Sequence, residues 1–185
     1  MRSMQSVGYR KMEDREVPYI KELYEASFPK SEKKPFEVMV KGNERMYAVV
    51  EEDRACGLLF TLEDANHILI DYFAVDPQAR KRQIGSRVLK QFFAAHDKPI
   101  VLEIEDPWST EVPAERALRQ RRKAFYLRNG MREQAYNVDL FGVRMEMLAT
   151  VETFSFEAYL SLLKTCLFDG VERYVALAEK TTRES

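Results

Sequence analysis

The chain has 185 residues, of which 45% are hydrophobic, and a formal net charge of −1. This length and apolar content are typical of one packed domain, which buries about 70% of its unfolded surface and needs no disulfide or metal to fold. The near-zero charge provides no general attraction to nucleic acid or to an anionic membrane, so we expect neither as a partner.

The distribution of polar and apolar residues excludes further classes of protein. Cys56, Cys166, His67 and His96 show no metal-ligand spacing, so no metal site is expected. No apolar run is long enough to span a bilayer, and residues 1–10 lack the apolar segment of a signal peptide. We therefore expect a cytoplasmic protein.

Hydrophobic periodicity predicts a mixture of helices and strands along the chain. The expected helices cover residues 16–28, 35–40, 83–95, 114–128 and 156–168. The expected strands cover residues 9–12, 46–51, 56–62, 67–75, 99–104, 134–140 and 143–149. Strand 67–75, helix 83–95 and strand 99–104 form a strand–helix–strand unit, so these two strands should be parallel with a right-handed crossover.

The chain is expected to divide after the last predicted hairpin. Residues 1–150 form the main domain, and residues 151–185 form a C-terminal helical extension with a polar tail. The sequence leaves open whether this extension packs on the domain or pairs with a second copy in a homodimer.

The most informative segment joins strand 67–75 to the next helix. The strand ends at Pro77, and a basic loop leads to a glycine in the first turn of the helix. Backbone N–H groups and cations at a helix N-terminus bind phosphate or pyrophosphate, although a basic loop can also be a solvated turn. The candidate phosphate-binding residues are Arg80, Lys81, Arg82, Gln83, Ile84, Gly85 and Ser86.

A second motif ends the helix 114–128, where residues 124–131 read Ala-Phe-Tyr-Leu-Arg-Asn-Gly-Met. Its Tyr126 is either an aromatic core residue or a functional phenol. On the same helix, Arg121 interrupts an apolar stripe, so we expect a buried guanidinium. A carboxylate such as Glu103, or an anionic part of a ligand, would then have to pair with it.

The two motifs together resemble those of the GNAT acyltransferases. The matching residues in the family pattern V-x-P-x-x-R-x-x-G-x-G/A-S are Val75, Pro77, Arg80, Gly85 and Ser86. Gln83 stands where the pattern has its first glycine. Residues 124–131 resemble the family's A/R-x-F-Y-x-x-x-G-F, with a methionine in place of the last phenylalanine. The resemblance covers roughly residues 9–149.

The resemblance implies an α/β (α+β) fold with a GNAT-like mixed, largely antiparallel central sheet. We expect about six to seven strands, helices on both faces and a central parallel βαβ unit. The implied cosubstrate is acetyl-CoA, without a metal, in the splay between strands 68–75 and 99–104. Backbone groups of Phe73, Ala74 and Val75 would hold the pantetheine arm. The loop from Arg80 to Ser86 would hold the pyrophosphate.

The resemblance also implies catalytic roles. Tyr126 lies where the family often has its general acid, and a phenol can protonate a leaving CoA thiolate. An alkylamine with a pKa of about 10.4 is almost fully protonated at pH 7, so a base must remove a proton. Glu103 and Asp71 are the candidate carboxylates, unless they pair with arginines of the next helix.

We therefore expect an acetyl-CoA-dependent N-acetyltransferase that transfers the acetyl group directly to a primary amine of a small molecule or peptide. Because Gln83 replaces a glycine, the alternative is a non-catalytic acyl-CoA-binding or sensing domain. The Arg-rich helix could also bind nucleic acid, but the neutral charge and the lack of interleaved aromatic residues argue against this.

Overall fold

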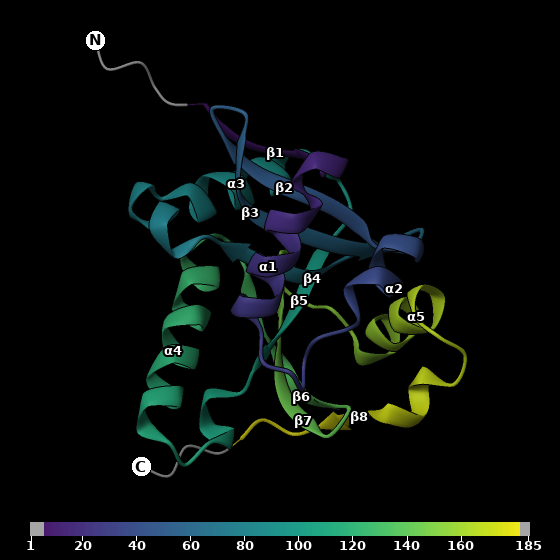
Figure 1. Ribbon diagram of the computed structural model, residues 1–185. Helices are drawn as coiled ribbons and strands as arrows, with labels where there is room; N and C mark the ends of the chain where they lie inside the picture. The colour runs from purple at the N-terminus through teal and green to yellow at the C-terminus, as the bar shows by residue number, and fades with distance from the viewer. Residues whose placement is uncertain (1–5, 182–185) are drawn as a thin grey trace. The chain divides into compact units, whose positions relative to one another are not determined.

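The computed structural model describes residues 6–181, except for the side chains of Lys81 and Arg82. Its helices and strands are labelled in Figure 1. The chain forms two compact units. Among the described residues, unit 1 consists of residues 6–62 and 70–97, and unit 2 of residues 63–69 and 98–181.

Unit 1 contains four strands in the order β1-β2-β3-β4, and β1, β2 and β3 pair antiparallel. Its strands are β1 (Val7–Lys11), β2 (Arg45–Glu51), β3 (Arg54–Glu63) and the larger part of β4 (Ile68–Val75). Its helices are α1 (Val17–Ser27), α2 (Phe36–Lys41) and α3 (Ile84–Ala94), with the 3-10 helices η1 (Asp14–Glu16) and η2 (Pro77–Arg82). The turn between β2 and β3 places Glu52 and Asp53 at φ 50° and 62°, the type of turn that matches the twist of a hairpin.

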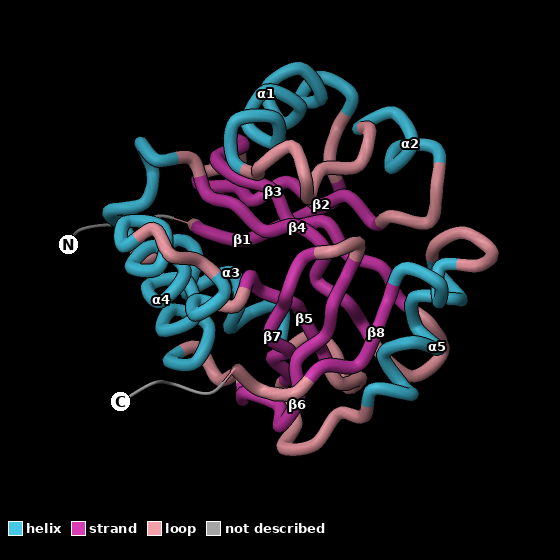
Figure 2. The backbone as a smooth tube through the Cα atoms, turned by 90° about the horizontal axis from the view of Figure 1, so that it is seen from below, coloured by secondary structure: helices cyan, strands magenta, loops and turns pink. Residues whose placement is uncertain are grey.

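The core of unit 1 lies between its strands and the helices α1 and α2, which cover one face (Figure 2). Tyr24, Phe60 and Tyr72 meet there, with ring centroids 4.9 to 6.3 Å apart. Burying each such side chain contributes about 1.5–3 kcal/mol. Helix α3 lies on the other face, where Phe92 contacts Tyr9 at 5.4 Å. Helices on both faces are therefore confirmed for unit 1.

Unit 2 contains five strands in the order β4-β5-β7-β6-β8, to which β4 contributes its first residues. The strands are β5 (Ile100–Glu105), β6 (Arg132–Leu140), β7 (Val143–Ala149) and β8 (Val175–Ala178). The helices are α4 (Pro113–Arg128), α5 (Phe156–Cys166) and the 3-10 helices η3 (Pro107–Ser109) and η4 (Val171–Tyr174). Ile68 pairs with Ile100 in a parallel ladder, and the other pairs of strands are antiparallel.

The structure confirms the mixed, largely antiparallel fold and the parallel β4–β5 pair. All five helices and all seven strands expected from the sequence are present. The short strand β8 was not expected, and it pairs with β6 from Leu140 to Asn137. The C-terminal segment therefore adds a strand to unit 2. Within residues 6–181, no helix is both long enough and apolar enough to cross a bilayer.

Candidate functional site

The loop that leaves β4 is held by hydrogen bonds of its own side chains and by one bond from Tyr19 of α1. Asp76 caps η2, because its carboxylate accepts a hydrogen bond from the backbone N–H of Gln78 at 2.9 Å. The same carboxylate accepts a second bond from the hydroxyl of Tyr19 at 2.7 Å, and the two bonds lower the pKa of Asp76. Arg80 donates from Nε to the carbonyl oxygen of Val75 at 3.0 Å. The end of β4 and the start of η2 are therefore fixed relative to each other.

Gln83 adopts the backbone conformation that favours glycine. Its φ of 55° and ψ of 28° lie in the left-handed region, directly before the first residue of α3. An L-residue with a side chain pays about 1–2 kcal/mol for this conformation. Gln83 therefore has, at the position where the family pattern has glycine, a backbone conformation that glycine adopts without this cost.

The residues around Gln83 fit a polyphosphate. The N–H groups in the first turn of α3, from Ile84 to Ser86, precede the first intrahelical bond, in which Arg87 donates to the carbonyl of Gln83 at 3.0 Å. These groups and the helix dipole favour an anion. Lys81 and Arg82 belong to η2, but their side chains lie outside the described part of the structure.

Gly57 lets β3 approach the end of β4. A Cβ atom at this position would lie 2.5 Å from the carbonyl oxygen of Ala74 and 3.2 Å from the Cα of Val75. The backbone of Ala74 and Val75 therefore requires glycine opposite it. Gly57 was not predicted from the sequence as a site residue, although an isolated glycine in an apolar strand often marks a close backbone approach.

Asp71 lies in the part of β4 that belongs to unit 1, and it forms an ion pair with Lys34. Lys34 also lies 3.0 Å from Oε1 of Glu44. The neighbouring Tyr72 donates to the carbonyl of Glu32 at 2.6 Å. Neither Lys34 nor Glu44 was identified from the sequence, because both lie outside the apolar elements and far from Asp71 along the chain.

The two carboxylates of β5 belong to unit 2. Glu105 forms an ion pair with Arg119 of α4, whose Nη1 also donates to the carbonyl of Asp106 at 3.0 Å. Glu103 is half-buried and lies opposite Met147 in the β5–β7 ladder. The expected type of pair, an α4 arginine with a β5 carboxylate, is thus made by Glu105 and Arg119.

The expectation of a buried Arg121 is wrong, because its side chain is exposed. The buried cation of α4 is Lys123, whose side chain is 10% exposed and lies 2.7 Å from Glu146 and 2.9 Å from Glu133. The helix is rotated so that Lys123 and Tyr126, rather than the predicted stripe, face inward.

Tyr126 is buried in unit 2 and contacts the ring of Phe125 edge-on at 5.2 Å. Burial raises its pKa to about 12, and the positive charge of Arg122 acts in the opposite direction. The phenol is therefore protonated throughout the neutral pH range, as a proton donor must be.

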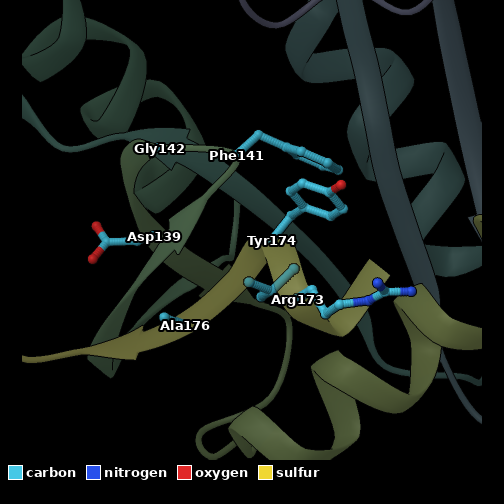
Figure 3. Close-up of a pocket in the computed structure, with 7 residues that line it drawn as sticks. Asp139, Phe141, Gly142, Arg173, Tyr174 and Ala176 are labelled. Atoms are coloured by element: carbon cyan, nitrogen blue, oxygen red, sulfur yellow. The ribbon is translucent and has the colours of Figure 1, made fainter. Parts of the chain in front are cut away.

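A pocket of about 380 Å³ in unit 2 contains none of the predicted site residues. Figure 3 shows Phe141 and Tyr174 in this pocket. Their rings stack, with centroids 5.4 Å apart. Phe141 has a φ of 48° in the turn between β6 and β7. Among the described residues, no group of three histidine, cysteine, aspartate or glutamate side chains is arranged to hold a metal ion.

Comparisons with known proteins assign the fold. The structure is similar to that of a protein from Bacteroides thetaiotaomicron assigned to the GNAT family, with TM-score 0.69 and 22% identity, covering 85% of this chain and 96% of that one. A GNAT family acetyltransferase from Elizabethkingia anophelis with acetyl-CoA bound gives TM-score 0.57 and 14% identity, covering 78% and 96%. A Bacillus subtilis acetyltransferase in complex with CoA gives TM-score 0.55 and 14% identity, covering 78% and 97%.

Sequence comparison identifies the family as well as the fold. No curated protein sequence matches the chain. The profile described as the acetyltransferase (GNAT) family matches residues 11–110, which is more than half of the chain. The matched segment includes the loop from Asp76 to Ser86 and the carboxylates Asp71 and Glu103. The chain therefore belongs to the GNAT acetyltransferase family.

Proposed function

We propose that the chain is an acetyl-CoA-dependent N-acetyltransferase that transfers the acetyl group directly to a primary amine. The observation that carries this proposal is the glycine-like backbone of Gln83 at the start of α3. A glycine-like backbone at the family's glycine position supports a phosphate-binding turn there, in a chain of the acetyltransferase family. Two structures with this fold, at 14% identity each, contain acetyl-CoA or CoA.

We assign cofactor binding to the segment from Phe73 to Ser86. Backbone groups of Phe73, Ala74 and Val75 would bind the pantetheine arm. Gly57 supports this part of β4, because it allows β3 to approach closely. The first turn of α3 would bind the pyrophosphate through its N–H groups. The positive charges that the sequence places at Arg80, Lys81 and Arg82 would add to this attraction.

The chemistry divides between a proton donor and a proton acceptor. Bound acetyl-CoA would supply an activated acetyl thioester. We assign the proton donor to Tyr126, because its pKa of about 12 keeps the phenol protonated at neutral pH. Asp71 and Glu103 remain the candidates to take the proton from the acceptor's ammonium group.

Thermal denaturation with acetyl-CoA tests the cofactor assignment. A ligand at 100 times its Kd stabilises the folded state by about 2.7 kcal/mol, so a clear rise in Tm is expected. Release of free CoA thiol with a panel of primary amines then tests the transfer. Absence of any Tm shift at saturating acetyl-CoA would contradict the proposal. A shift without turnover on any amine would identify the non-catalytic acyl-CoA-binding alternative.

A further inference from the structure

Three side chains of unit 1 meet where the segment between α1 and α2 passes β4. The ammonium group of Lys34 contacts the carboxylate of Asp71 and lies 3.0 Å from Oε1 of Glu44. The Glu44 and Asp71 side chains are 4% and 10% exposed, whereas that of Lys34 is 30% exposed. The carboxyl groups therefore form the closed end of the cluster, and the lysine approaches from the side that is open to solvent.

Two features besides the ion pairs favour a cation at this place. The ring of Tyr72 lies 5.9 Å from Nζ of Lys34, within the range of a cation–π contact. The second oxygen of Glu44, Oε2, is buried and has no hydrogen-bond donor among the described residues. The site therefore offers a cation the aromatic face of Tyr72. It also offers a buried oxygen, Oε2 of Glu44, to which Lys34 donates no hydrogen bond.

The cluster lies beside the proposed cofactor-binding segment. Asp71 and Phe73 are two residues apart on β4, so their side chains share one face of the strand. The rise of about 3.3 Å per residue separates their Cα atoms by about 7 Å. Phe73 is the first residue that we assign to the pantetheine arm. The Lys34 ammonium group is thus bound next to this segment, within unit 1.

The charges of the cluster balance only while a cation is bound. Burial and the neighbouring Asp71 raise the pKa of Glu44, because two buried carboxyl groups side by side disfavour a second negative charge. Burial acts to lower the pKa of Lys34, but the charges of Asp71 and Glu44 outweigh it and raise that pKa. Lys34 can leave without exposing an unpaired buried Asp71 only if another cation replaces it.

We propose that Asp71 and Glu44 bind the ammonium group of the acceptor, and that Lys34 occupies their site when no acceptor is bound. This inference rests on the proposed acetyltransferase function and deepens it. Lys34 reaches the carboxylates with an unbranched alkyl arm. The site therefore selects a primary ammonium on a similar arm, as in a polyamine or a lysine side chain.

Binding of n-butylammonium chloride to the full chain tests this site, with Lys34→Met as the variant. Methionine keeps much of the alkyl stem but removes the competing charge. Because the competitor reduces the fraction of protein able to bind, we expect Lys34→Met to bind butylammonium about tenfold or more tighter than the wild type in calorimetry. Adding Asp71→Asn to Lys34→Met should abolish the binding.

The matched control is Lys33→Met, because Lys33 pairs with Glu25 at 2.6 Å, outside the cluster. It should bind butylammonium as weakly as the wild type does. Equal affinities for the wild type and Lys34→Met would overturn the inference. Binding that survives Asp71→Asn would overturn it as well.

A measurement on the wild-type protein avoids dependence on the folding of Lys34→Met. The ammonium ¹⁵N signal of Lys34, assigned by its loss in Lys34→Arg, should shift on titration with butylammonium, whereas the Lys33 signal should not. An unchanged ¹⁵N signal of Lys34 at saturating butylammonium would contradict the displacement of Lys34 by the added ammonium. Failure of acetyl-CoA to raise Tm would contradict the proposed function. The butylammonium measurements test the cation site independently of that result.

Discussion

Tyr19 and Asp76 are 57 residues apart in sequence, yet the hydroxyl of Tyr19 donates a hydrogen bond of 2.7 Å to the carboxylate of Asp76. Tyr19 lies on α1, and Asp76 caps the 3-10 helix that follows β4. The bond therefore ties helix α1 to the start of the proposed pyrophosphate loop.

Tyr19→Phe should weaken acetyl-CoA binding about fivefold, or about 1 kcal/mol, which is part of the roughly 1.5–3 kcal/mol that a hydrogen bond to a charged group contributes. The Kd from calorimetry checks this. The control is Tyr174→Phe, because Tyr174 is exposed in unit 2 and its loss should leave the Kd unchanged. Equal Kd values for Tyr19→Phe and the wild type would show that the bond does not support the loop.

The lowered pKa of Asp76 adds a pH dependence to the same loop. Its contribution to stability is present above the unfolded pKa of about 3.9 and is lost as pH falls through the lower folded pKa. Asp76→Asn should therefore flatten the acid side of the stability profile below about pH 4. Urea denaturation at several pH values measures this, and a profile identical to the wild type would contradict it.

Gln83→Gly should stabilise the protein, because glycine adopts a φ of 55° without the cost that glutamine pays. We expect a gain of about 1 kcal/mol in the free energy of unfolding, with tighter acetyl-CoA binding. Gln78→Gly is the matched control. Gln78 lies in η2 without a positive φ, so glycine should destabilise there. Destabilisation by Gln83→Gly would refute the assignment of backbone strain.

Tyr126→Phe should lower turnover well over tenfold while leaving the Kd for acetyl-CoA nearly unchanged, because only the proton donor is removed. Since the pKa of Tyr126 is about 12, the wild type should show no loss of rate from its ionisation below about pH 11. Steady-state kinetics across pH measure both effects.

Tyr136→Phe is the control for Tyr126→Phe. Tyr136 is another tyrosine of unit 2, and its hydroxyl donates to the carbonyl of Phe154 at 2.8 Å. This variant should lower stability but not turnover. If Tyr126→Phe retains wild-type turnover, the assignment of Tyr126 as the general acid is wrong.

Lys123→Met should destabilise the protein by about 3 kcal/mol, because it leaves Glu146 buried without its cation. Adding Glu146→Gln should restore part of this loss. The net raised pKa of Lys123 arises because Glu146 and Glu133 outweigh the lowering by burial. Its contribution to stability is therefore full below about pH 10.4 and is lost as pH rises through the higher folded pKa.

Urea denaturation of Lys123→Met and of the double variant checks the charge cluster of α4. Arg121→Met is the matched control, because Arg121 is exposed on the same helix and should change stability little. Equal losses for Lys123→Met and Arg121→Met would show that the buried pair does not stabilise unit 2.

Much of this protein is determined by local sequence. Apolar periodicity determines the helices and seven of the strands, because a helix or strand needs one apolar face whatever it packs against. Pro77 and the glycine in the first turn of α3 likewise mark the proposed phosphate-binding loop, since their backbone preferences act within a few residues.

Other features depend on contacts between distant segments, and only the tertiary structure decided them. The rotation of α4 about its axis buries Lys123 rather than Arg121. Hydrophobic periodicity could not predict this, because polar residues interrupt the apolar face of α4 and leave its orientation toward the sheet undetermined. The strand β8 exists because β6 offers it a hydrogen-bonding edge. Lys34 and Glu44 meet Asp71 only after α1, α2 and β4 pack, since long-range charge pairing leaves no periodic trace in the sequence.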